Sequence, residues 1–161
     1  MENSSFSEDT KLLKVINIDV LTASPDVFTA EKDLNGIEHA EIPLLNFELE
    51  NGENFLMASI PISIAIDISR IISGVNGNDS RLTLAELIPE ICVVDKIIID
   101  SIIPYSNAYQ ATVEIRLEGF SDVQHFQMIP SHATLLALIA NADIYVSDNI
   151  IRTIDNLEDE D

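Results

Sequence analysis

The stretch FQMIPSHATLLALIANADIYVSDNII, residues Phe126 to Ile151, contains the pattern that decides the fold. It predicts a strand that ends at Ile129, a helix start at Pro130-Ser131 and an apolar helix from about Ala133 to Ala140. Proline presets φ for a first helical turn, and a serine hydroxyl can cap the free N–H groups of that turn. Because apolar residues cover every side of the helix, it has no face to offer water and is predicted to lie buried at the centre of the core.

The residues after this helix predict a break at Asn141, a short strand from Ile144 to Val146 and one more helix. Ser147-Asp148 is suited to cap that final helix. Its apolar positions recur at helical spacing, at Ile150, Ile151, Ile154 and Leu157. The chain is therefore expected to pass from the buried helix through a strand into a terminal amphipathic helix.

Three other segments have the composition of strands. From Val15 to Val20 the residues alternate, and the predicted core side carries Ile16, Ile18 and Val20. From Ala108 to Glu118 the predicted core side carries Tyr109, Ala111, Val113, Ile115 and Leu117, and the solvent side carries Gln110, Thr112, Glu114, Arg116 and Glu118. The segment from Val93 to Ile99 is apolar and β-branched, which predicts a buried strand.

Turn and cap signals divide the rest of the chain. Residues 43–61 predict a β-hairpin, since Asn51-Gly52 supplies the two positive-φ residues of a type I′ turn between apolar arms. Residues 61–73 fit both a strand and a helix that would end at Gly74. Thr83 and Glu86 form the Thr-x-x-Glu capping box of a short helix limited by Pro89, whereas residues 24–36 fit a short helix or a loop.

These segments predict an α+β fold, with a mixed or antiparallel sheet of about five to seven strands and helices packed on it. We expect one domain over residues 13–157, between a disordered acidic tail at 1–12 and an acidic tail at 158–161. No apolar run reaches the roughly 18 residues of a membrane-spanning helix, and the first residues are acidic and polar. We therefore expect a cytoplasmic protein without a membrane partner.

The charge and the cysteine content exclude several classes of function. The formal net charge is −20, from 28 acidic and 8 basic residues, so the chain has few cations with which to displace phosphate counterions. Strong general affinity for nucleic acid is therefore disfavoured. The single Cys92 excludes an intrachain disulfide and a cysteine-based zinc site, and its apolar neighbours predict a buried, inert thiol.

The opening stretch resembles the signature of the bifunctional nuclease (BFN) domain family, Arg-Pro-Ser-Asp-Ala with a following Leu-Ala-Leu and then Pro-Ile-Tyr-Val. The matching residues are Pro130, Ser131, Ala133, Leu136, Ala137, Leu138, Ile144, Tyr145 and Val146. Two polar positions differ, since Ile129 stands for the family's Arg and His132 for its Asp.

The resemblance extends over roughly Val15 to Ile154. Further matching residues are Pro43, Gly52, Leu56, Ile60, Arg81, Leu87, Tyr109 and Ala111. The family has a helix over residues 61–73, which favours the helix there, and usually carries a Glu early in it where this chain has Ile64. The resemblance thus implies a BFN-like fold for nearly the whole domain.

The resemblance also implies a candidate nuclease that acts on DNA or RNA. Phosphodiester cleavage needs a positioned water and neutralised charge, usually from divalent metals on carboxylates or from Arg, Lys and His. The family's polar positions correspond here to Arg81, Glu86, Ser131 and His132, with Asp67 as a further candidate. Mg²⁺ or Mn²⁺ would be the implied cofactor.

Each candidate also has a purely structural interpretation. Glu86 fits a capping-box partner, Ser131 an N-cap, and His132 a surface residue at a helix start, while Asp67 fits the solvent side of its helix. Arg81, which precedes the capping box, is the candidate most suited to bind a phosphate or carboxylate.

Two hypotheses follow for the function. The first is a BFN-family nuclease, although whether the chain is an enzyme stays open because the signature Arg and Asp are replaced. The second is a catalytically degenerate BFN-fold homodimer that acts as an interaction or regulatory module. The resemblance implies the homodimer. Isoleucines on short elements offer apolar surface for such an interface, namely Ile62, Ile66, Ile102 and Ile103.

Overall fold

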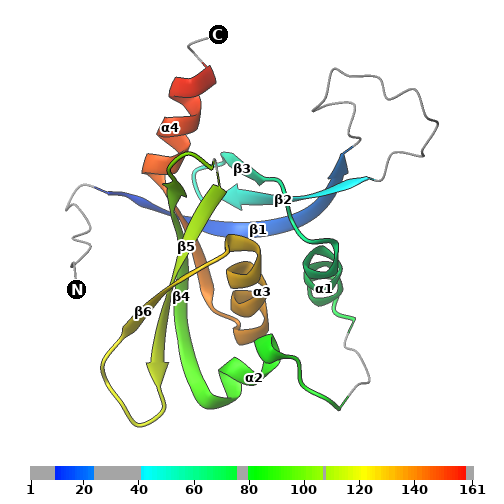
Figure 1. Cartoon of the computed structure of the whole chain (residues 1–161), viewed down its shortest axis with the longest axis vertical. Coiled ribbons are helices and arrows are strands. Elements are labelled where there is room, and N and C mark those ends of the chain that lie inside the picture. The colour runs from blue at the N-terminus through cyan, green and yellow to red at the C-terminus, as the bar shows by residue number, and fades with distance from the viewer. Residues whose placement is uncertain (1–9, 24–40, 76–79, 107, 159–161) are drawn as a thin grey trace.

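A computed structural model describes residues 10–23, 41–75, 80–106 and 108–158 of the chain, with the side chains of 154–158 left aside. In this described part, seven strands form one mixed sheet and four helices pack against it (Figure 1). The elements in chain order are β1 (Leu12–Ala23), β2 (Ile42–Leu49), β3 (Asn54–Met57), α1 (Ile62–Ile72), α2 (Leu84–Ile91), β4 (Cys92–Ile103), β5 (Ala108–Leu117), β6 (Gln124–Met128), α3 (Pro130–Ala140), β7 (Asp143–Ser147) and α4 (Asp148–Glu158). The predicted α+β class and number of strands are confirmed.

The sheet has the order β3-β2-β1-β7-β4-β5-β6. Only β4 and β7 pair in parallel, and the chain between them runs through β5, β6 and α3; the other neighbours described are antiparallel. β7 thus enters the middle of the sheet directly after α3. The predicted break lies at Asn141, whose φ of +53° ends the helix in the left-handed region.

α3 is the central helix of the core, as the sequence predicts. Residues 133–137 are all buried, and the last three residues of the helix are half-buried. α1 and α2 both pack on α3, which itself packs on β4 and β5. Figure 1 shows α3 running in front of the sheet, with its start near β1 and β3 and its end beside α2.

The segment that fitted either a strand or a helix is α1, which begins at Ile62. It ends in a Schellman motif, because the Gly74 N–H donates to the Ile71 carbonyl at 3.0 Å and the Val75 N–H donates to the Arg70 carbonyl at 3.0 Å. Gly74 has a φ of +69°, which a residue without Cβ adopts easily. The helix favoured by the resemblance is confirmed.

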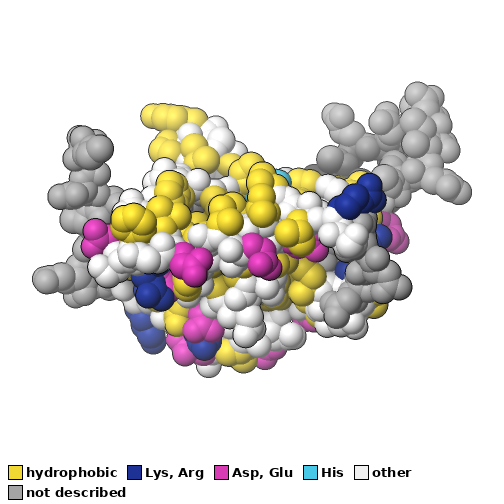
Figure 2. All heavy atoms as spheres, turned by 90° about the horizontal axis from the view of Figure 1, so that it is seen from below, with side chains coloured by type: hydrophobic (Ala, Val, Ile, Leu, Met, Phe, Trp, Pro, Cys, Tyr) yellow, Lys and Arg dark blue, Asp and Glu magenta, His cyan; other side chains and the backbone are white. Residues whose placement is uncertain are grey.

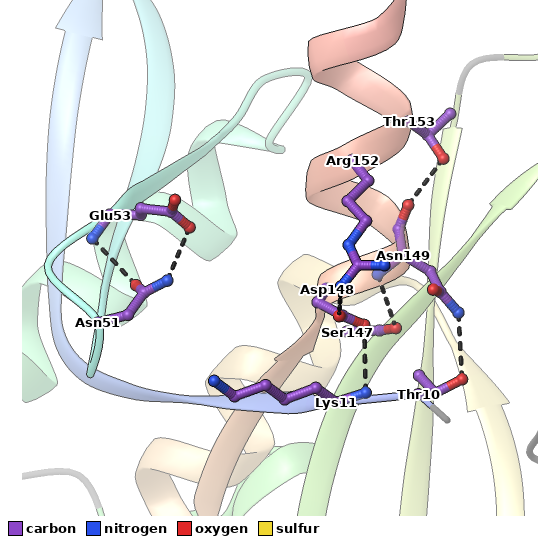
Figure 3. Close-up of polar contacts among 9 residues, drawn as sticks. All are labelled: Thr10, Lys11, Asn51, Glu53, Ser147, Asp148, Asn149, Arg152 and Thr153. Carbon is purple, nitrogen blue, oxygen red and sulfur yellow. Dashed lines mark hydrogen bonds and ion pairs between the residues drawn. The ribbon is translucent and has the colours of Figure 1, made fainter. Parts of the chain in front are cut away.

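The hairpin of β2 and β3 is present, but its predicted type I′ turn is wrong. Gly52 has a φ of +87°, whereas Asn51 is not among the residues with positive φ. Instead, the Gly52 N–H donates to the Leu49 carbonyl at 2.9 Å and the Leu49 N–H donates to the Glu53 carbonyl at 2.8 Å, the pattern of a type I turn closed by a glycine bulge. The Asn51 side chain accepts from the Glu53 N–H at 3.1 Å, which stabilises this alternative (Figure 3).

The predicted core side of β1 is wrong at Ile16. The pairing of β1 with β2 shifts between Val15 and Asn17, so Ile16 is the extra residue of a β-bulge. A bulge reverses the alternation on one side of it, and Ile16 is consequently exposed while Leu13 and Ile18 are buried. The core side of this strand changes phase halfway along.

The alternation in β5 also has two exceptions. Leu117, predicted to face the core, is half exposed because β5 ends there at the rim of the sheet. Thr112, predicted to face solvent, is buried, and its hydroxyl donates to the Asp100 carboxylate at 2.6 Å. β4 therefore partly shields the polar side of β5 from solvent.

Two bulges in β4 each insert an aspartate. The pairing with β5 shifts between Val94 and Lys96 and again between Ile99 and Ser101, so Asp95 and Asp100 are the extra residues. Asp95 accepts two hydrogen bonds from the Arg116 guanidinium, at 2.6 and 2.7 Å, which lower the pKa of its carboxyl. Desolvation by burial instead raises the pKa of Asp100, against the hydrogen bonds from Thr112 and Ser101. The pKa of an aspartate is thus lowered at one bulge and raised at the other.

Asp100→Asn is expected to be more stable than the wild type at pH 7, by a larger margin than at pH 4. A carboxyl whose pKa is raised on folding contributes stability that is complete below its unfolded pKa of about 3.9 and is lost as the pH rises through the folded pKa. An amide at this position removes that loss, so the advantage of the variant should shrink as the pH falls. Urea unfolding of both proteins between pH 4 and pH 7 measures it.

Asp95→Asn is the matched control for this experiment, because the pKa of Asp95 is lowered instead. Its contribution is present above the unfolded pKa and is lost as the pH falls through the folded pKa. The variant should therefore be less stable than the wild type at pH 7, with the difference shrinking toward low pH. Equal pH dependence of the two variants would contradict the assignment.

The start of α4 is held against the start of β1 (Figure 3). The Asp148 carboxylate accepts from the Lys11 backbone N–H at 3.2 Å and pairs with Arg152 at 2.8 Å, while the Asp148 N–H donates to the Lys11 carbonyl at 3.0 Å. Ser147 acts as the predicted cap, with its hydroxyl accepting from the Asn149 N–H at 3.4 Å. The Thr10 hydroxyl also accepts from the Asn149 side-chain amide at 3.2 Å, so the contacts of α4 with the segment before β1 include Thr10.

α2 begins with the predicted capping box. The Thr83 N–H donates to the Glu86 carboxylate at 2.7 Å, and the Glu86 N–H donates to the Thr83 hydroxyl at 3.3 Å. The helix ends two residues after Pro89, at Ile91. Cys92 follows at once and is buried, as predicted, and burial raises the pKa of its thiol. Glu86 therefore has a defined structural role at the helix start.

Candidate functional site

A cavity of about 230 Å³ lies at the start of α3. Three segments that are far apart in the sequence surround it, namely the link between β3 and α1, the turn between β4 and β5 with the start of β5, and the start of α3. The lining residues are Met57, Ala58, Ser59, Ile60, Ser106, Ala108, Tyr109, Ile129, Pro130 and Ser131. We refer to it as the α3 cavity.

The helix start at the α3 cavity differs from the predicted one. The N-cap is Ile129, which makes no side-chain cap hydrogen bond, and Pro130 occupies the first helical position. Because Pro130 already has helical φ, Ser131 lies inside the first turn and cannot be the N-cap. The predicted N-cap role of Ser131 is therefore wrong, and its hydroxyl does not cap the helix.

Ser131 is almost completely buried, with an exposed fraction of 2%, and it lines the α3 cavity. Within the described part of the chain its hydroxyl has no hydrogen-bond partner, whereas the neighbouring Thr134 hydroxyl donates to the Pro130 carbonyl at 2.8 Å. Since no fully buried side-chain oxygen among the described residues lacks a partner, the Ser131 oxygen reaches the space of the cavity.

The opposite wall of the α3 cavity is formed by backbone in an unusual conformation and by an aromatic ring. Ser59 has a φ of +60°, a left-handed conformation that residues other than Gly, Asn and Asp adopt rarely. The Tyr109 ring packs edge-on against Phe55, with centroids 5.2 Å apart, and burial raises the pKa of its phenol. Both residues are therefore fixed by the surrounding structure rather than by local sequence preference.

The candidate residues from the sequence are divided between the two ends of α3. Ser131 lines the cavity at the start of the helix, and His132 is exposed beside it. Arg81 and Glu86 lie at the start of α2, which Figure 1 shows beside the other end of α3. An α-helix rises about 1.5 Å per residue, and α3 has 11 residues. The structure thus brings Ser131 and His132 together and separates them from Arg81 and Glu86.

Asp67 lies on α1, half-buried, and pairs with Arg70 one turn later at 3.7 Å. It does not line the α3 cavity. In the described residues, no cluster of three or more His, Cys, Asp or Glu side chains is arranged to hold a metal ion. None of the helices in the described ranges is long and apolar enough to cross a membrane.

The α3 cavity has the chemical character of a small binding site. Its lining combines hydroxyl side chains, the start of a helix and apolar side chains, with neither Asp nor Glu among the lining residues. The arrangement can accept a polar group by hydrogen bonds and exclude water from the apolar part of the same molecule.

The chain was compared with models of known protein families and with curated protein sequences. No family model matches it, and no curated protein matches at a significant level.

Proposed function

We propose that this chain is a diverged member of the BFN domain family that acts as a homodimeric interaction module. One observation supports the family. Four residues that match the family's motifs, from three distant segments of the chain, line the same α3 cavity. They are Ile60, Tyr109, Pro130 and Ser131.

The observation that carries the interaction module is an uncovered apolar surface on the hairpin of β5 and β6. Its residues are Leu117, Phe120, Val123 and Phe126, all exposed, and we refer to it as the β6 face. Within the described elements, β5 is the main packing neighbour of β6. Figure 2, viewed from below, shows hydrophobic side chains exposed over much of this face, with acidic and basic side chains between them. Contiguous exposed apolar surface is typical of an interaction site.

The free edge of β6 favours a second copy of the chain as the partner. β6 is the last strand of the sheet, and its sequence, Gln124–Met128, contains neither the lysine nor the proline that commonly protect an edge strand. Two β6 edges can pair antiparallel about a two-fold axis, which makes the interface self-complementary and continues the sheet across it. Phe126 of each copy would then be covered at the centre.

The isoleucines expected at such an interface lie elsewhere. Ile62 and Ile66 are exposed on α1, Ile103 is exposed at the end of β4, and Ile102 is half-buried. None of them belongs to the β6 face. Self-association itself stays a prediction, with the β6 face as the proposed surface.

Phe126→Lys is expected to dissociate the homodimer, weakening association at least tenfold, because the dimer would have to bury an unpaired ammonium group. Phe126 is 53% exposed in the single chain, so the fold should tolerate the change. Sedimentation velocity at micromolar concentration and about 0.15 M salt, where screening limits the repulsion between two acidic chains, measures the oligomeric state.

Leu56→Lys is the matched control for this experiment. Leu56 lies on β3, the edge strand at the other side of the sheet, and is 55% exposed. It should leave the dimer intact. A monomeric wild type, or a dimer that Leu56→Lys dissociates and Phe126→Lys does not, rejects the β6 face as the interface.

A nuclease acting on DNA or RNA is the second candidate, favoured by the free helix end in the α3 cavity, since helix N-termini bind phosphate readily. The test is a titration with labelled single-stranded DNA and RNA, with and without Mg²⁺ or Mn²⁺. The net charge of −20 argues for weak binding without metal at physiological salt. Metal-dependent cleavage would favour the nuclease over the interaction module. Its loss in Ser131→Ala would assign it to the α3 cavity, and its loss in Arg81→Ala alone would assign it to the start of α2.

A further inference from the structure

The first turn of α3 offers backbone N–H groups that the helix itself does not use. The first N–H groups of a helix lack carbonyl partners in the helix. Pro130 has no N–H, and the Ala133 N–H already donates to the Ile129 carbonyl at 3.0 Å. Within the described residues, the N–H groups of Ser131 and His132 therefore stay without a partner, at the end where the helix dipole is positive.

The Ser131 hydroxyl is an independent observation that points to a ligand. It is one of the few buried polar side chains of the described core, yet it makes no hydrogen bond there and reaches the α3 cavity. A molecule in the cavity can accept a hydrogen bond from this hydroxyl, and the two free N–H groups belong to the same turn.

The lining of the α3 cavity sets the size and charge of what fits. About 230 Å³ is less than the roughly 300–1,000 Å³ of pockets for drug-sized molecules. The space therefore suits one small group, or the head group of a longer molecule. The free polar groups are the N–H groups of Ser131 and His132 and the Ser131 hydroxyl, and all three can donate a hydrogen bond. The lining contains no carboxylate to repel an anion. A group rich in acceptor oxygens is complementary to it.

We propose that the α3 cavity binds a small oxyanion, the phosphate or carboxylate group of a small molecule, on the N–H groups of Ser131 and His132 and the hydroxyl of Ser131. The site lies on the helix start and not on the β6 face, so it depends neither on dimer formation nor on membership of the BFN family. It adds a ligand site to the proposed interaction module.

An NMR titration of the full chain tests the site, with inorganic phosphate, acetate and adenosine monophosphate as separate probes. Sodium chloride at equal ionic strength is the reference, because salt alone screens the charge of an acidic protein. We expect saturable shifts of the Ser131 and His132 amide resonances with at least one probe beyond the chloride reference. Saturable shifts with phosphate but not with acetate identify a phosphoryl site. Saturable shifts with acetate but not with phosphate identify a carboxylate site.

Ser131→Ala should weaken binding about tenfold, the effect of losing one hydrogen bond to a charged group. Ser131→Asp should abolish binding, since it places a like charge in the cavity. Ser73→Ala, at the far end of α1, is the matched control and should bind as the wild type does. Shifts no larger than those in chloride, or unchanged affinity in both Ser131 variants, overturn the proposal. Sedimentation of the same samples reports dimerisation separately.

Discussion

Ala137→Asp is expected to unfold the domain at 25 °C. Ala137 has an exposed fraction of 0% in the middle of α3, the helix on which α1 and α2 both pack. A buried carboxylate without a partner costs several kcal/mol, against a total stability of about 5–15 kcal/mol for an ordinary domain. Far-UV circular dichroism and the dispersion of amide resonances measure the loss of structure.

His132→Asp is the matched control on the same helix. His132 is exposed in the first turn of α3, where a negative charge interacts favourably with the helix dipole by about 0.3–1 kcal/mol. This variant should fold and melt at the same temperature as the wild type or slightly higher. If Ala137→Asp folds equally well, α3 is not the centre of the core.

The central helix could be predicted because its signal is local. A helix that is apolar on every side must be buried wherever it lies, and the left-handed Asn141 ends it where the apolar run stops. The capping box of α2 is equally local, since Thr83 and Glu86 satisfy each other within one turn. Such features need no information about distant parts of the chain.

Bulges could not be predicted, because a bulge is a property of two strands. The alternation around Ile16 looks regular in the sequence, and only the pairing of β1 with β2 shows that it is interrupted. The same holds for Asp95 and Asp100, which read as ordinary polar positions until β5 is placed beside β4. The Arg116 guanidinium that β5 supplies lowers the pKa of Asp95. Burial raises the pKa of Asp100 and outweighs its hydrogen bond from Thr112.

The candidate site shows the same division between local and distant information. Ser131 could be singled out from its motif, but its predicted role was wrong because Pro130 starts the helix one position earlier. Ser59 and Tyr109 were not identified as site residues, since only the fold brings them to the start of α3. Arg81 and Glu86 belong to a motif of the same family resemblance and yet lie at the other end of the helix. Motif membership therefore did not predict proximity.

Phe47→Ala is expected to lower the free energy of unfolding by about 3–5 kcal/mol, the usual cost of truncating a fully buried aromatic side chain. Phe47 has an exposed fraction of 0% and packs on Phe55 across the β2–β3 hairpin, with ring centroids 5.9 Å apart. The void would remove contacts on one side of Phe55, which the surrounding core can replace only in part. Urea unfolding followed by circular dichroism measures the change.

The effect of Phe47→Ala should also reach the α3 cavity, because Phe55 is packed between Phe47 and the Tyr109 ring that lines it. We therefore expect the aromatic resonances of Tyr109 to shift in the folded variant. Leu56→Ala, on the neighbouring residue of β3 whose side chain is exposed, should cost less than about 1 kcal/mol and leave Tyr109 unchanged. Equal losses of stability in the two variants would mean that the hairpin does not pack its Phe47 side on the core, and an unshifted Tyr109 would mean that the cavity wall is held independently of it.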